Sequence, residues 1–421
     1  MKRKKQKFEI VSGKELYGEF KNQTSKNATL PILSASILCD GEVRLEQVPN
    51  LLDVKNMLCL LRKLGVRIKH IDNDVMLNFK NLKNVQIDCK ISRTMRSSIF
   101  LLGSMLSRFG SAIITMPGGC KIGERPIDIH IKALKKLGVK VINFGEQLFF
   151  HVKKAKPGVV KLRIPSVGAT ENIIQFACKI KGKTTILNSA REPEVVDLCN
   201  FLNKMGAKIV GAGTKKITIY GVDKLHNTIY KPTNDRIVAG TVLTAVAICG
   251  GDVTISNTNP IENEKLIKIL RIMGCQIETN SDIIHIVSNK ALKSIRCVKT
   301  GYYPNFPTDM QSCVLTLMTV TQGVGVVKEN IFENRFLNIS QLQKMGAQIK
   351  QLNSHTVEIS GVEYLNGMQV EAKDLRGGAS LILAGLVAKG KTIVSNIEHI
   401  DRGYDHIETI LSNLGANIRR I

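Results

Sequence analysis

The sequence LRKLGV at residues 61–66 is the best indication of the fold, because close variants of it recur five more times along the chain. These variants are LKKLGV at Leu134, LNKMGA at Leu202, LRIMGC at Leu270, LQKMGA at Leu342 and LSNLGA at Leu411. Successive copies lie about 70 residues apart, and a fixed period of this size indicates an internal repeat. We therefore predict that six copies of one structural unit make up the chain.

Each unit begins with an apolar segment whose pattern predicts a helix. The six segments are Ala28 to Leu38, Ser97 to Leu106, Ala169 to Ile180, Ala239 to Cys249, Met310 to Val320 and Ala379 to Ala388. A turn and a β-branched strand follow, namely EVRL, AIIT, TTIL, DVTI, VGVV or KTIV. A second, amphipathic helix then ends at the repeated L-x-x-[LM]-G, whose glycine acts as a left-handed cap.

Alternating stretches after this glycine, such as VRIKHIDNDVMLNF, predict hairpins. The unit is βαβαββ-like, which predicts a mixed α/β fold. The sixth unit stops at Ile421 before its hairpin returns, and we expect the strand Phe8 to Ser12 to supply the missing partner. With three units to a domain, the first domain spans residues 22–233, and the second is discontinuous and combines residues 1–21 with 234–421.

Composition limits the class of protein. The chain has 421 residues, 43% of them hydrophobic, and a formal net charge of +25. This charge indicates nucleic-acid binding, a basic cleft for small anions, or simply a solvated basic surface. Basic residues are spread along the chain and only 5% of residues are aromatic, so stacking platforms for nucleic acid are scarce.

The ten cysteines are scattered and form no C-x-x-C pair, which disfavours structural zinc and a disulfide framework. The basic N-terminus is not followed by the apolar segment of a signal peptide, and no apolar run is long enough to span a bilayer. No metal cluster or dinucleotide-binding motif is present, so no cofactor is expected. We expect a cytoplasmic protein with no membrane partner.

Unusual polar residues gather at two places in every unit. The strand-to-helix loops carry Cys120 with Arg125, Arg191 with Glu192, Glu333 with Arg335, and Asp401 with Arg402. The starts of the apolar helices carry Lys26 with Asn27, Arg96, Ser166 with Gly168 and Thr170, Asp235 with Arg236, Thr308 with Asp309, and Asp374 with Arg376. Helix N-termini attract anions, so six of them facing one cleft would hold a polyanion. Surface ion pairs are the alternative interpretation of the arginines.

Two residues in these places carry a more specific chemical hypothesis. Cys120 lies in MPGGCKIGERPIDIH, residues 116–130, where two glycines favour a turned loop and Lys121 and Arg125 favour the thiolate. The alternative is a small buried hydrophobe. Asp309 opens an apolar helix and is either an N-cap or a general base.

Several of these stretches together resemble one known family. They are SKNATLPIL, RTMRSSI, PGGC followed by G-x-R-P-x-D-x-H, PSVGATEN, AREPEVVD, FPTDMQ, FENRF, DLRGGASL and HIDRGY. This set, which runs essentially from end to end of the chain, is similar to the UDP-N-acetylglucosamine 1-carboxyvinyltransferases, a family of enolpyruvyl transferases. The resemblance implies a two-domain inside-out α/β barrel with three repeats in each domain and an active site in the interdomain cleft.

The resemblance also implies a reaction and its residues. The enolpyruvyl group of phosphoenolpyruvate moves to the 3-hydroxyl of UDP-N-acetylglucosamine with release of phosphate, by addition and elimination. Cys120 is implied as proton donor and as the target of the epoxide fosfomycin, and Asp309 as base or positioning group. The implied phosphoenolpyruvate contacts are Lys26, Arg96, Arg125, Arg376 and Arg402. The implied sugar-nucleotide contacts are Asn27, Arg96, Arg125, Ser166, Val167, Gly168, Asp309 and Ile331.

The chain departs from the family pattern in three places. Gln23-Thr24-Ser25 lacks a glycine before Lys26, Val238 replaces a carboxylate, and Gly377 with Gly378 is expected to loosen a helix start. These departures concern closure of the cleft rather than the reaction itself. A slow or regulatory relative, a shikimate 3-phosphate enzyme and a basic nucleic-acid-binding protein are the alternatives.

Overall fold

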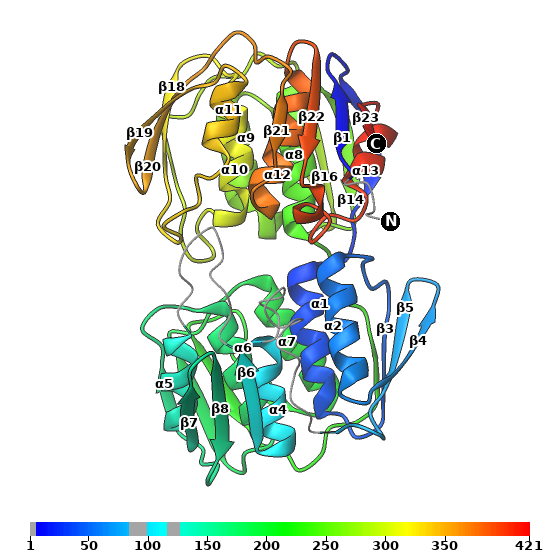
Figure 1. Cartoon of the computed structure of the whole chain (residues 1–421), viewed down its shortest axis with the longest axis vertical. Helices are drawn as coiled ribbons and strands as arrows, with labels where there is room; N and C mark the ends of the chain where they lie inside the picture. Colours follow the sequence, from blue (N-terminus) through cyan, green and yellow to red (C-terminus); the bar gives the residue numbers. More distant parts are fainter. Residues whose placement is uncertain (1–5, 84–98, 116–126) are drawn as a thin grey trace. The chain divides into compact units, whose positions relative to one another are not determined.

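The computed structural model describes residues 6–83, 99–115 and 127–421, and the chain divides into two compact units (Figure 1). Within these described ranges, one unit comprises residues 24–233 and the other comprises residues 6–23 and 234–421. Each unit contains three small sheets, and among the described residues all of them are mixed except the antiparallel sheet β6-β8-β7.

One repeat illustrates the structural unit. Its element order is β9 (Val159–Lys161), α6 (Val167–Ala177), β10 (Lys183–Leu187), α7 (Pro193–Lys204), β11 (Lys208–Val210) and β12 (Lys216–Tyr220), which is the predicted βαβαββ order. The sheet order is β11-β12-β10-β9. Strand β10 runs parallel to β9 and antiparallel to β12. The parallel pair is joined through a helix, and the antiparallel pair β11–β12 through the short loop of residues 211–215.

Four of the other five sheets follow the same four-stranded plan, and three antiparallel strands of the fifth lie in the described residues. The unit of residues 24–233 also contains β13 (Thr228–Tyr230), β3 (Glu42–Leu45), β5 (Asp74–Asn78) and β4 (Arg67–Ile71) in one sheet, and β6 (Ser111–Thr115), β8 (Gln147–Val152) and β7 (Val139–Phe144) in another.

The second unit contains β15 (Gln276–Thr279), β16 (Ile283–Ser288), β14 (Gly251–Ser256) and β2 (Leu16–Lys21) in its first sheet. Its second sheet holds β17 (Cys297–Lys299), β18 (Val324–Lys328), β20 (Thr356–Ser360) and β19 (Gln348–Asn353). Its third sheet holds β21 (Gln369–Glu371), β22 (Lys391–Ser395), β1 (Phe8–Val11) and β23 (Asn417–Arg420).

The first strand of the chain completes the last repeat. Strand β1 lies between β22 and β23 and pairs antiparallel with both, with Phe8 opposite Val394 on one side and Arg420 on the other. The predicted pairing of the two ends of the chain is therefore confirmed. In the other unit, β13 follows the third repeat and pairs parallel with β3 of the first repeat, so that unit is also closed by a strand distant in sequence.

The apolar helices lie inside each unit and the sheets lie outside. These helices are α1 (Lys26–Ala35), α4 (Leu101–Phe109), α6, α8 (Arg236–Cys249), α10 (Gln311–Met318) and α12 (Leu375–Val387). Every residue of α8 and of α10 is buried, as a helix without a polar face requires. Helices α8, α10 and α12 pack against one another, as α4 does against α1 and α6.

The second helix of each repeat is amphipathic. These helices are α2 (Leu52–Lys63), α5 (Asp128–Lys136), α7, α9 (Glu264–Met273), α11 (Ile339–Lys344) and α13 (Ile407–Asn413). Each is followed by the glycine of the repeated signature, and all six glycines have positive φ, from 90° at Gly65 to 122° at Gly274. At Gly65 a Cβ atom would also lie 2.4 Å from the Asn81 carbonyl oxygen. The predicted left-handed caps are confirmed.

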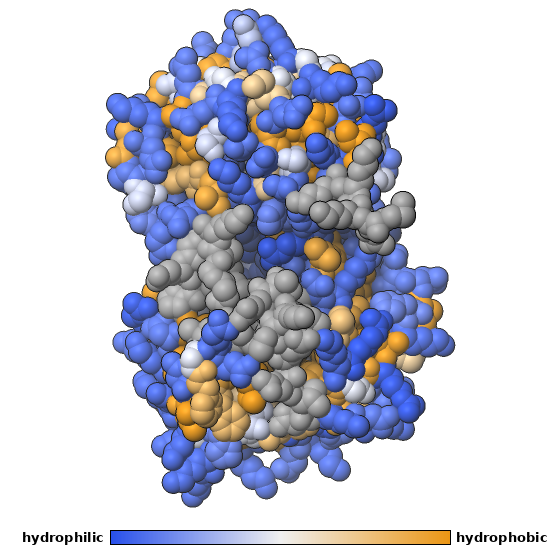
Figure 2. All heavy atoms as spheres, viewed as in Figure 1, coloured by the Kyte–Doolittle hydropathy of each residue, from blue (hydrophilic) through white to orange (hydrophobic). Residues whose placement is uncertain are grey.

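Short 3₁₀ segments complete the described elements: η1 (Ser36–Leu38), η3 (Pro260–Asn263), η4 (Thr308–Met310) and η5 (Ile397–His399). Hydrophilic side chains cover most of the visible face of each unit (Figure 2), as expected for a chain rich in lysine and arginine. In the described residues, the longest apolar helices fall short of the length that a membrane crossing requires.

Candidate active site

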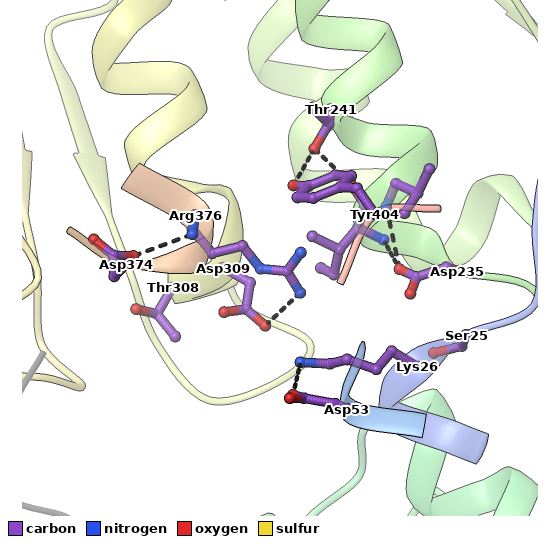
Figure 3. A network of polar contacts seen from close by, with 12 residues as sticks. Ser25, Lys26, Asp53, Asp235, Thr241, Thr308, Asp309, Asp374, Arg376 and Tyr404 are labelled. Carbon is purple, nitrogen blue, oxygen red and sulfur yellow. Dashed lines mark hydrogen bonds and ion pairs between the residues drawn. The ribbon is translucent and has the colours of Figure 1, made fainter. Parts of the chain in front are cut away.

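Aspartates cap two of the buried helices in the unit of residues 6–23 and 234–421 (Figure 3). Asp235 Oδ1 accepts hydrogen bonds from the backbone nitrogens of Ile237 and Val238 at 2.9 and 3.1 Å, at the start of α8. Asp374 Oδ1 accepts from the nitrogens of Arg376 and Gly377 at 3.1 and 3.0 Å, at the start of α12. These caps satisfy backbone donors that the helices leave unpaired.

The helix start after Asp374 is regular, so the expected loosening by Gly377 and Gly378 is wrong. A Cβ atom on Gly378 would lie 2.7 Å from Ile400 Cγ1. A Cβ atom on Gly377 would lie 2.5 Å from Asp374 Oδ2. The two glycines are needed because the cap and the loop containing Ile400 approach the helix closely.

Asp309 lies between two buried arginines at the start of α10. Arg335 Nη2 donates to Asp309 Oδ1 at 2.8 Å and to the Thr308 carbonyl oxygen at 3.2 Å. Arg376 Nη2 lies 3.5 Å from Asp309 Oδ2. The arginine side chains are 3% and 4% exposed and Asp309 is 28% exposed, so the carboxylate is the accessible member. We define Asp309, Arg335 and Arg376 as the Asp309 cluster.

The Asp309 cluster has one positive charge in excess, because two guanidinium groups face one carboxylate. Burial works against the charge of Arg376, but the attraction of Asp309, Tyr404 and Asp235 outweighs it and raises the pKa of Arg376. The Arg376 guanidinium carbon lies 5.5 Å from the centre of the Tyr404 ring. The two guanidinium groups can therefore attract an anion to the place where the Asp309 carboxylate is exposed.

The sequence singled out Arg335 only as one of the charged loop residues and did not single out Glu329, and the structure places both beside predicted site residues. Glu329 is fully buried, and its Oε1 accepts from the nitrogens of Ile331 and Phe332 at 2.8 and 3.1 Å. Its Oε2 accepts from the Thr308 hydroxyl at 3.0 Å. Glu329 thus contacts both the Ile331 backbone and Thr308, the residue that precedes Asp309. The available sequence signal was a charged residue at the end of a buried strand.

Arg402 lies in the loop between η5 and α13. Its neighbour Asp401 forms two hydrogen bonds with Arg420 at 2.8 and 2.9 Å. Two residues further on, the Tyr404 hydroxyl lies 2.9 Å from that of Thr241. Burial raises the pKa of Tyr404 to about 12, although the charge of Arg376 opposes this rise. The loop is therefore held on both sides of Arg402.

In the unit of residues 24–233, Lys26 is the first residue of α1 and lies next to Asn27. A cation at this position opposes the helix dipole. Its Nζ lies 3.6 Å from Asp53 Oδ2 at the start of α2, and the two side chains are 12% and 7% exposed (Figure 3). The Ser25 hydroxyl caps α1 by accepting from the Ala28 nitrogen at 3.3 Å. Asp53 compensates the cost of placing this lysine here.

Ser166, Val167 and Gly168 form the start of α6. The Ser166 hydroxyl accepts from the Ala169 nitrogen at 3.4 Å. A Cβ atom on Gly168 would lie 3.2 Å from His130 Cε1, and Asn172 Nδ2 lies 3.1 Å from His130 Nδ1. His130, which ends the G-x-R-P-x-D-x-H motif, therefore packs on the start of α6. The sequence did not predict this contact.

Three predicted site residues, Cys120, Arg125 and Arg96, lie outside the described residues. Among the others, the structure brings Asp309 together with Arg376, and Glu329 contacts both the Ile331 nitrogen and the Thr308 hydroxyl. In the unit of residues 24–233, Lys26 and Asn27 lie at the start of α1. Ser166, Val167 and Gly168 lie at the start of α6 in the same unit.

The chain is similar to known proteins over nearly its whole length. Residues 10–411 match the family model described as EPSP synthase (3-phosphoshikimate 1-carboxyvinyltransferase). A UDP-N-acetylglucosamine 1-carboxyvinyltransferase 2 from Caldanaerobacter subterraneus subsp. tengcongensis is 44% identical over 419 residues, 99% of each chain. The UDP-N-acetylglucosamine 1-carboxyvinyltransferase of Finegoldia magna is also 44% identical, over 98% of each chain.

Solved structures share the fold at lower identity. The enolpyruvyl transferase NikO from Streptomyces tendae has a TM-score of 0.87 at 20% identity and covers 99% of both chains. The EPSP synthase from Acinetobacter baumannii has a TM-score of 0.75 at 18% identity, over 99% of this chain. The six repeats are thus arranged as in proteins of this fold.

Proposed function

The chain belongs to the EPSP synthase (3-phosphoshikimate 1-carboxyvinyltransferase) family, and from this membership we propose that it transfers the enolpyruvyl group of phosphoenolpyruvate to the 3-hydroxyl of UDP-N-acetylglucosamine. Phosphate is the second product, and the reaction is the first committed step of peptidoglycan synthesis. The sugar nucleotide, rather than shikimate 3-phosphate, is the acceptor because the relatives named for it match nearly the whole chain at 44% identity. This match is the observation that carries the proposal.

In the addition step, the acceptor hydroxyl oxygen forms a bond to C2 of phosphoenolpyruvate. Asp309 accepts the hydroxyl proton or orients the hydroxyl, and the Cys120 thiol delivers a proton to the methylene carbon C3. The product of addition is a tetrahedral intermediate that still carries phosphate. Each assisted proton transfer contributes about 10² to 10⁴ in rate.

In the elimination step, a proton leaves the new methyl group, the C2–C3 double bond re-forms and the C2–O bond to phosphate breaks. The carboxylate and phosphate of phosphoenolpyruvate need cationic partners, for which we propose Lys26, Arg96, Arg125, Arg376 and Arg402. The excess positive charge of the Asp309 cluster supports the assignment of Arg376. Arg335 orients Asp309 through the 2.8 Å hydrogen bond to Oδ1.

For the sugar nucleotide, we propose contacts from Asn27, Arg96, Arg125, Ser166, Val167, Gly168, Asp309 and Ile331. The hydroxyl-capped start of α6 supports a diphosphate at Ser166 to Gly168, because such a helix end attracts anions. We take the two units as the two three-repeat domains. The interdomain cleft expected from the sequence stays a prediction, and we propose a cytoplasmic location from the nature of the substrates.

The test is release of phosphate from phosphoenolpyruvate by the purified protein. We expect release with UDP-N-acetylglucosamine and none with shikimate 3-phosphate or without an acceptor. Release that requires shikimate 3-phosphate would assign the other reaction of the family, and no release in any condition would contradict the proposal. A low rate with tight binding of the sugar nucleotide would identify a regulatory relative.

Two variants of Cys120 test the proton donor. Cys120→Asp retains a group that can donate a proton, whereas Cys120→Ser does not at neutral pH, so we expect more activity in the first. Fosfomycin should label the wild type at Cys120 and leave both variants unlabelled. Equal turnover of all three proteins would remove Cys120 from the reaction.

A further inference from the structure

The outer side of the sheet β11-β12-β10-β9 carries lysines and apolar residues but no acids. Successive side chains of a strand point to opposite faces of its sheet. On these strands one set of side chains, which includes Ile186, Ile217 and Ile219, is buried in the core of the unit. The residues between them therefore point outward, and the strand pairing places them in three rows across the sheet.

Lysines occupy the two outer rows. One of these rows consists of Lys208, Tyr220 and Lys183. The other consists of Lys216, Leu187 and Lys161. All four lysines are exposed, and none of them forms an ion pair within the part of the chain that the structure describes. Their charges are therefore available to a partner.

The middle row ends in an exposed valine at each edge of the sheet. From one edge to the other, it consists of Val210, Thr218, Thr185 and Val159. The two valines are 57% and 61% exposed, and Tyr220 in the neighbouring row is 43% exposed. We define the residues of the three rows together as the lysine face. It combines positive charge of one sign with accessible apolar side chains.

The repeat itself does not require this composition. On the corresponding outer side of the sheet β15-β16-β14-β2, the outward residues include Glu19, Asp252 and Glu278. On the outer side of the sheet β17-β18-β20-β19, Lys350 lies opposite Glu358. Acidic residues thus interrupt the outer sides of these two sheets, whereas the lysine face has none.

Further lysines lie beside the lysine face. The loop before β9 packs against the turn that leads into β10, because a Cβ atom on Gly182 would lie 2.8 Å from Pro157 Cγ. This loop contains three exposed lysines, namely Lys153, Lys154 and Lys156. Asp223, three residues beyond β12, lies 3.7 Å from the ammonium group of Lys181, so a lysine outside the face offsets its charge.

The chemistry of the lysine face fits a partner that is anionic and partly apolar. An ammonium group is a point charge without a fixed fork of donors, so it suits an anionic surface whose groups can rearrange. Valine and tyrosine side chains between the lysines would lose water contact at such a surface, and tyrosine has the apolar body and polar tip that are typical of membrane interfaces. A polynucleotide fits less well, because the face has no arginine and only one aromatic ring for stacking.

We propose that the lysine face docks the protein on a bilayer surface that contains anionic phospholipid. The ammonium groups face the lipid phosphates, and Val159 and Val210 enter the headgroup layer. This contact is peripheral and needs no spanning segment, whereas the sequence-based expectation of no membrane partner concerned spanning segments and leader peptides. The inference goes beyond the proposed function and does not depend on it.

The experiment measures co-sedimentation of the full chain with lipid vesicles. One set of vesicles contains phosphatidylcholine alone, and the other contains equal parts of phosphatidylcholine and the anionic lipid phosphatidylglycerol. We expect binding to the anionic vesicles only. Added salt should weaken it, because salt at about 0.1 M already screens exposed charges beyond about 10 Å.

A triple variant removes the charges of the lysine face. It combines Lys183→Ala, Lys208→Ala and Lys216→Ala. Each lysine near an anionic bilayer strengthens binding by about fivefold, so the variant should bind the anionic vesicles about 100-fold more weakly. The pair Val159→Ser and Val210→Ser should weaken binding by roughly threefold to tenfold and leave its salt dependence unchanged, because it removes only apolar contact.

The sheet β17-β18-β20-β19 provides a matched control. The triple variant of Lys299→Ala, Lys328→Ala and Lys350→Ala removes three exposed lysines from strands of that sheet and gives the same net charge as the first triple variant. It should bind the anionic vesicles nearly as tightly as the wild type. Thermal unfolding of each variant checks that it is folded, and phosphate release should be unchanged in all of them.

Equal loss of vesicle binding in the two triple variants would overturn the inference, because net charge rather than the lysine face would then be responsible. Absence of wild-type binding to the anionic vesicles would also overturn it. Tighter binding to DNA than to these vesicles, lost in the first triple variant, would assign the face to a polynucleotide instead. If that variant does not fold, the single reversal Lys208→Glu replaces it. A wild type that releases no phosphate would contradict the proposed function and leave the vesicle result to stand by itself.

Discussion

The two units use the same repeat but cap their buried helices with different residues. In the unit of residues 24–233, the caps of α1 and α6 are Ser25 and Ser166. In the other unit, the caps of α8 and α12 are Asp235 and Asp374. Serine supplies only a hydrogen bond, whereas aspartate also offsets the positive end of the helix. The serine-capped ends therefore keep their attraction for an external anion.

The units also differ in how they treat buried carboxyl groups. Asp309 faces Arg335 and Arg376. In the other unit, both oxygens of Glu171 are buried without a hydrogen-bond partner among the described residues, and burial, followed by the charges of Glu194 and Glu192, raises its pKa well above the usual range. Asp309 thus lies beside two cations, whereas the burial of Glu171 favours its neutral acid. The repeat therefore fixes the positions of these groups, while the residue types at those positions determine the local charge.

The largest expected effect tests Asp309 as the charged member of its cluster. Asp309→Asn keeps the size and an acceptor oxygen but removes the negative charge and the ability to take a proton. We expect kcat to fall by about 10² to 10⁴, because a general base contributes about that much. Steady-state phosphate release on the folded variant measures this.

Asp374→Asn is the matched control, because asparagine caps a helix about as well as aspartate. Its turnover should fall far less than that of Asp309→Asn. If both variants lost turnover equally, the charge at helix starts, and not a base at Asp309, would be responsible.

The next effect concerns Asp197 in α7, another buried acid of the residue 24–233 unit. Burial raises the pKa of Asp197 to about 6, although hydrogen bonds from the Tyr230 hydroxyl and the Thr233 nitrogen oppose the rise. The folded state thus binds the proton more tightly than the unfolded chain. Stability from this group is complete below about pH 4 and is lost as the pH rises to about 6, by on the order of 3 kcal/mol.

Chemical unfolding of the wild type and Asp197→Asn from pH 4 to 7 checks this sign. Asparagine does not titrate, so the stability of the wild type relative to the variant should decrease across this interval. A stability difference that stays constant with pH, or that grows as the pH rises, would contradict a raised pKa in this unit.

The fold was predictable because its determinants are local. The apolar helices, the strands after them and the glycine caps follow one pattern that recurs about every 70 residues, so six copies reinforce each other. The pairing of β1 with β22 and β23 was predictable because the sixth repeat visibly lacked a strand. The pairing of β13 with β3 could not be predicted, because both strands are short and almost the whole unit separates them in sequence.

The sequence predicted several residues of the candidate site but few of the contacts between them. Asp309 and Arg376 were expected at helix starts, and the structure brings them together. The role of Arg335 depends on a loop 26 residues beyond Asp309, whose path no local pattern determines. His130 and Gly168 belong to different motifs, and their contact follows from the packing of α5 on α6. Contacts of this kind arise from tertiary packing, which a repeat pattern does not specify.

A smaller effect comes from exchanging the cap type between units. Ser166→Asp keeps a cap on α6 but adds a negative charge where we propose the diphosphate of the sugar nucleotide. The KM for UDP-N-acetylglucosamine should rise by roughly ten- to a hundredfold, the range of about 1.4 to 2.8 kcal/mol, while stability is retained. Calorimetric titration of UDP-N-acetylglucosamine checks this, and binding as tight as in the wild type would place the diphosphate elsewhere.

The smallest expected effect separates capping from binding within one unit. Ser25→Ala and Ser166→Ala each remove a hydroxyl cap, from the Ala28 nitrogen and the Ala169 nitrogen respectively. Each should lower the free energy of unfolding by about 1 kcal/mol, as measured by denaturant titration. Only Ser166→Ala should also weaken the binding of UDP-N-acetylglucosamine, because Ser25 is not a proposed contact of this substrate. If Ser25→Ala weakened the binding of the sugar nucleotide equally, a loosened helix start would explain both results. The proposed anion-binding role of the Ser166 cap would then be contradicted.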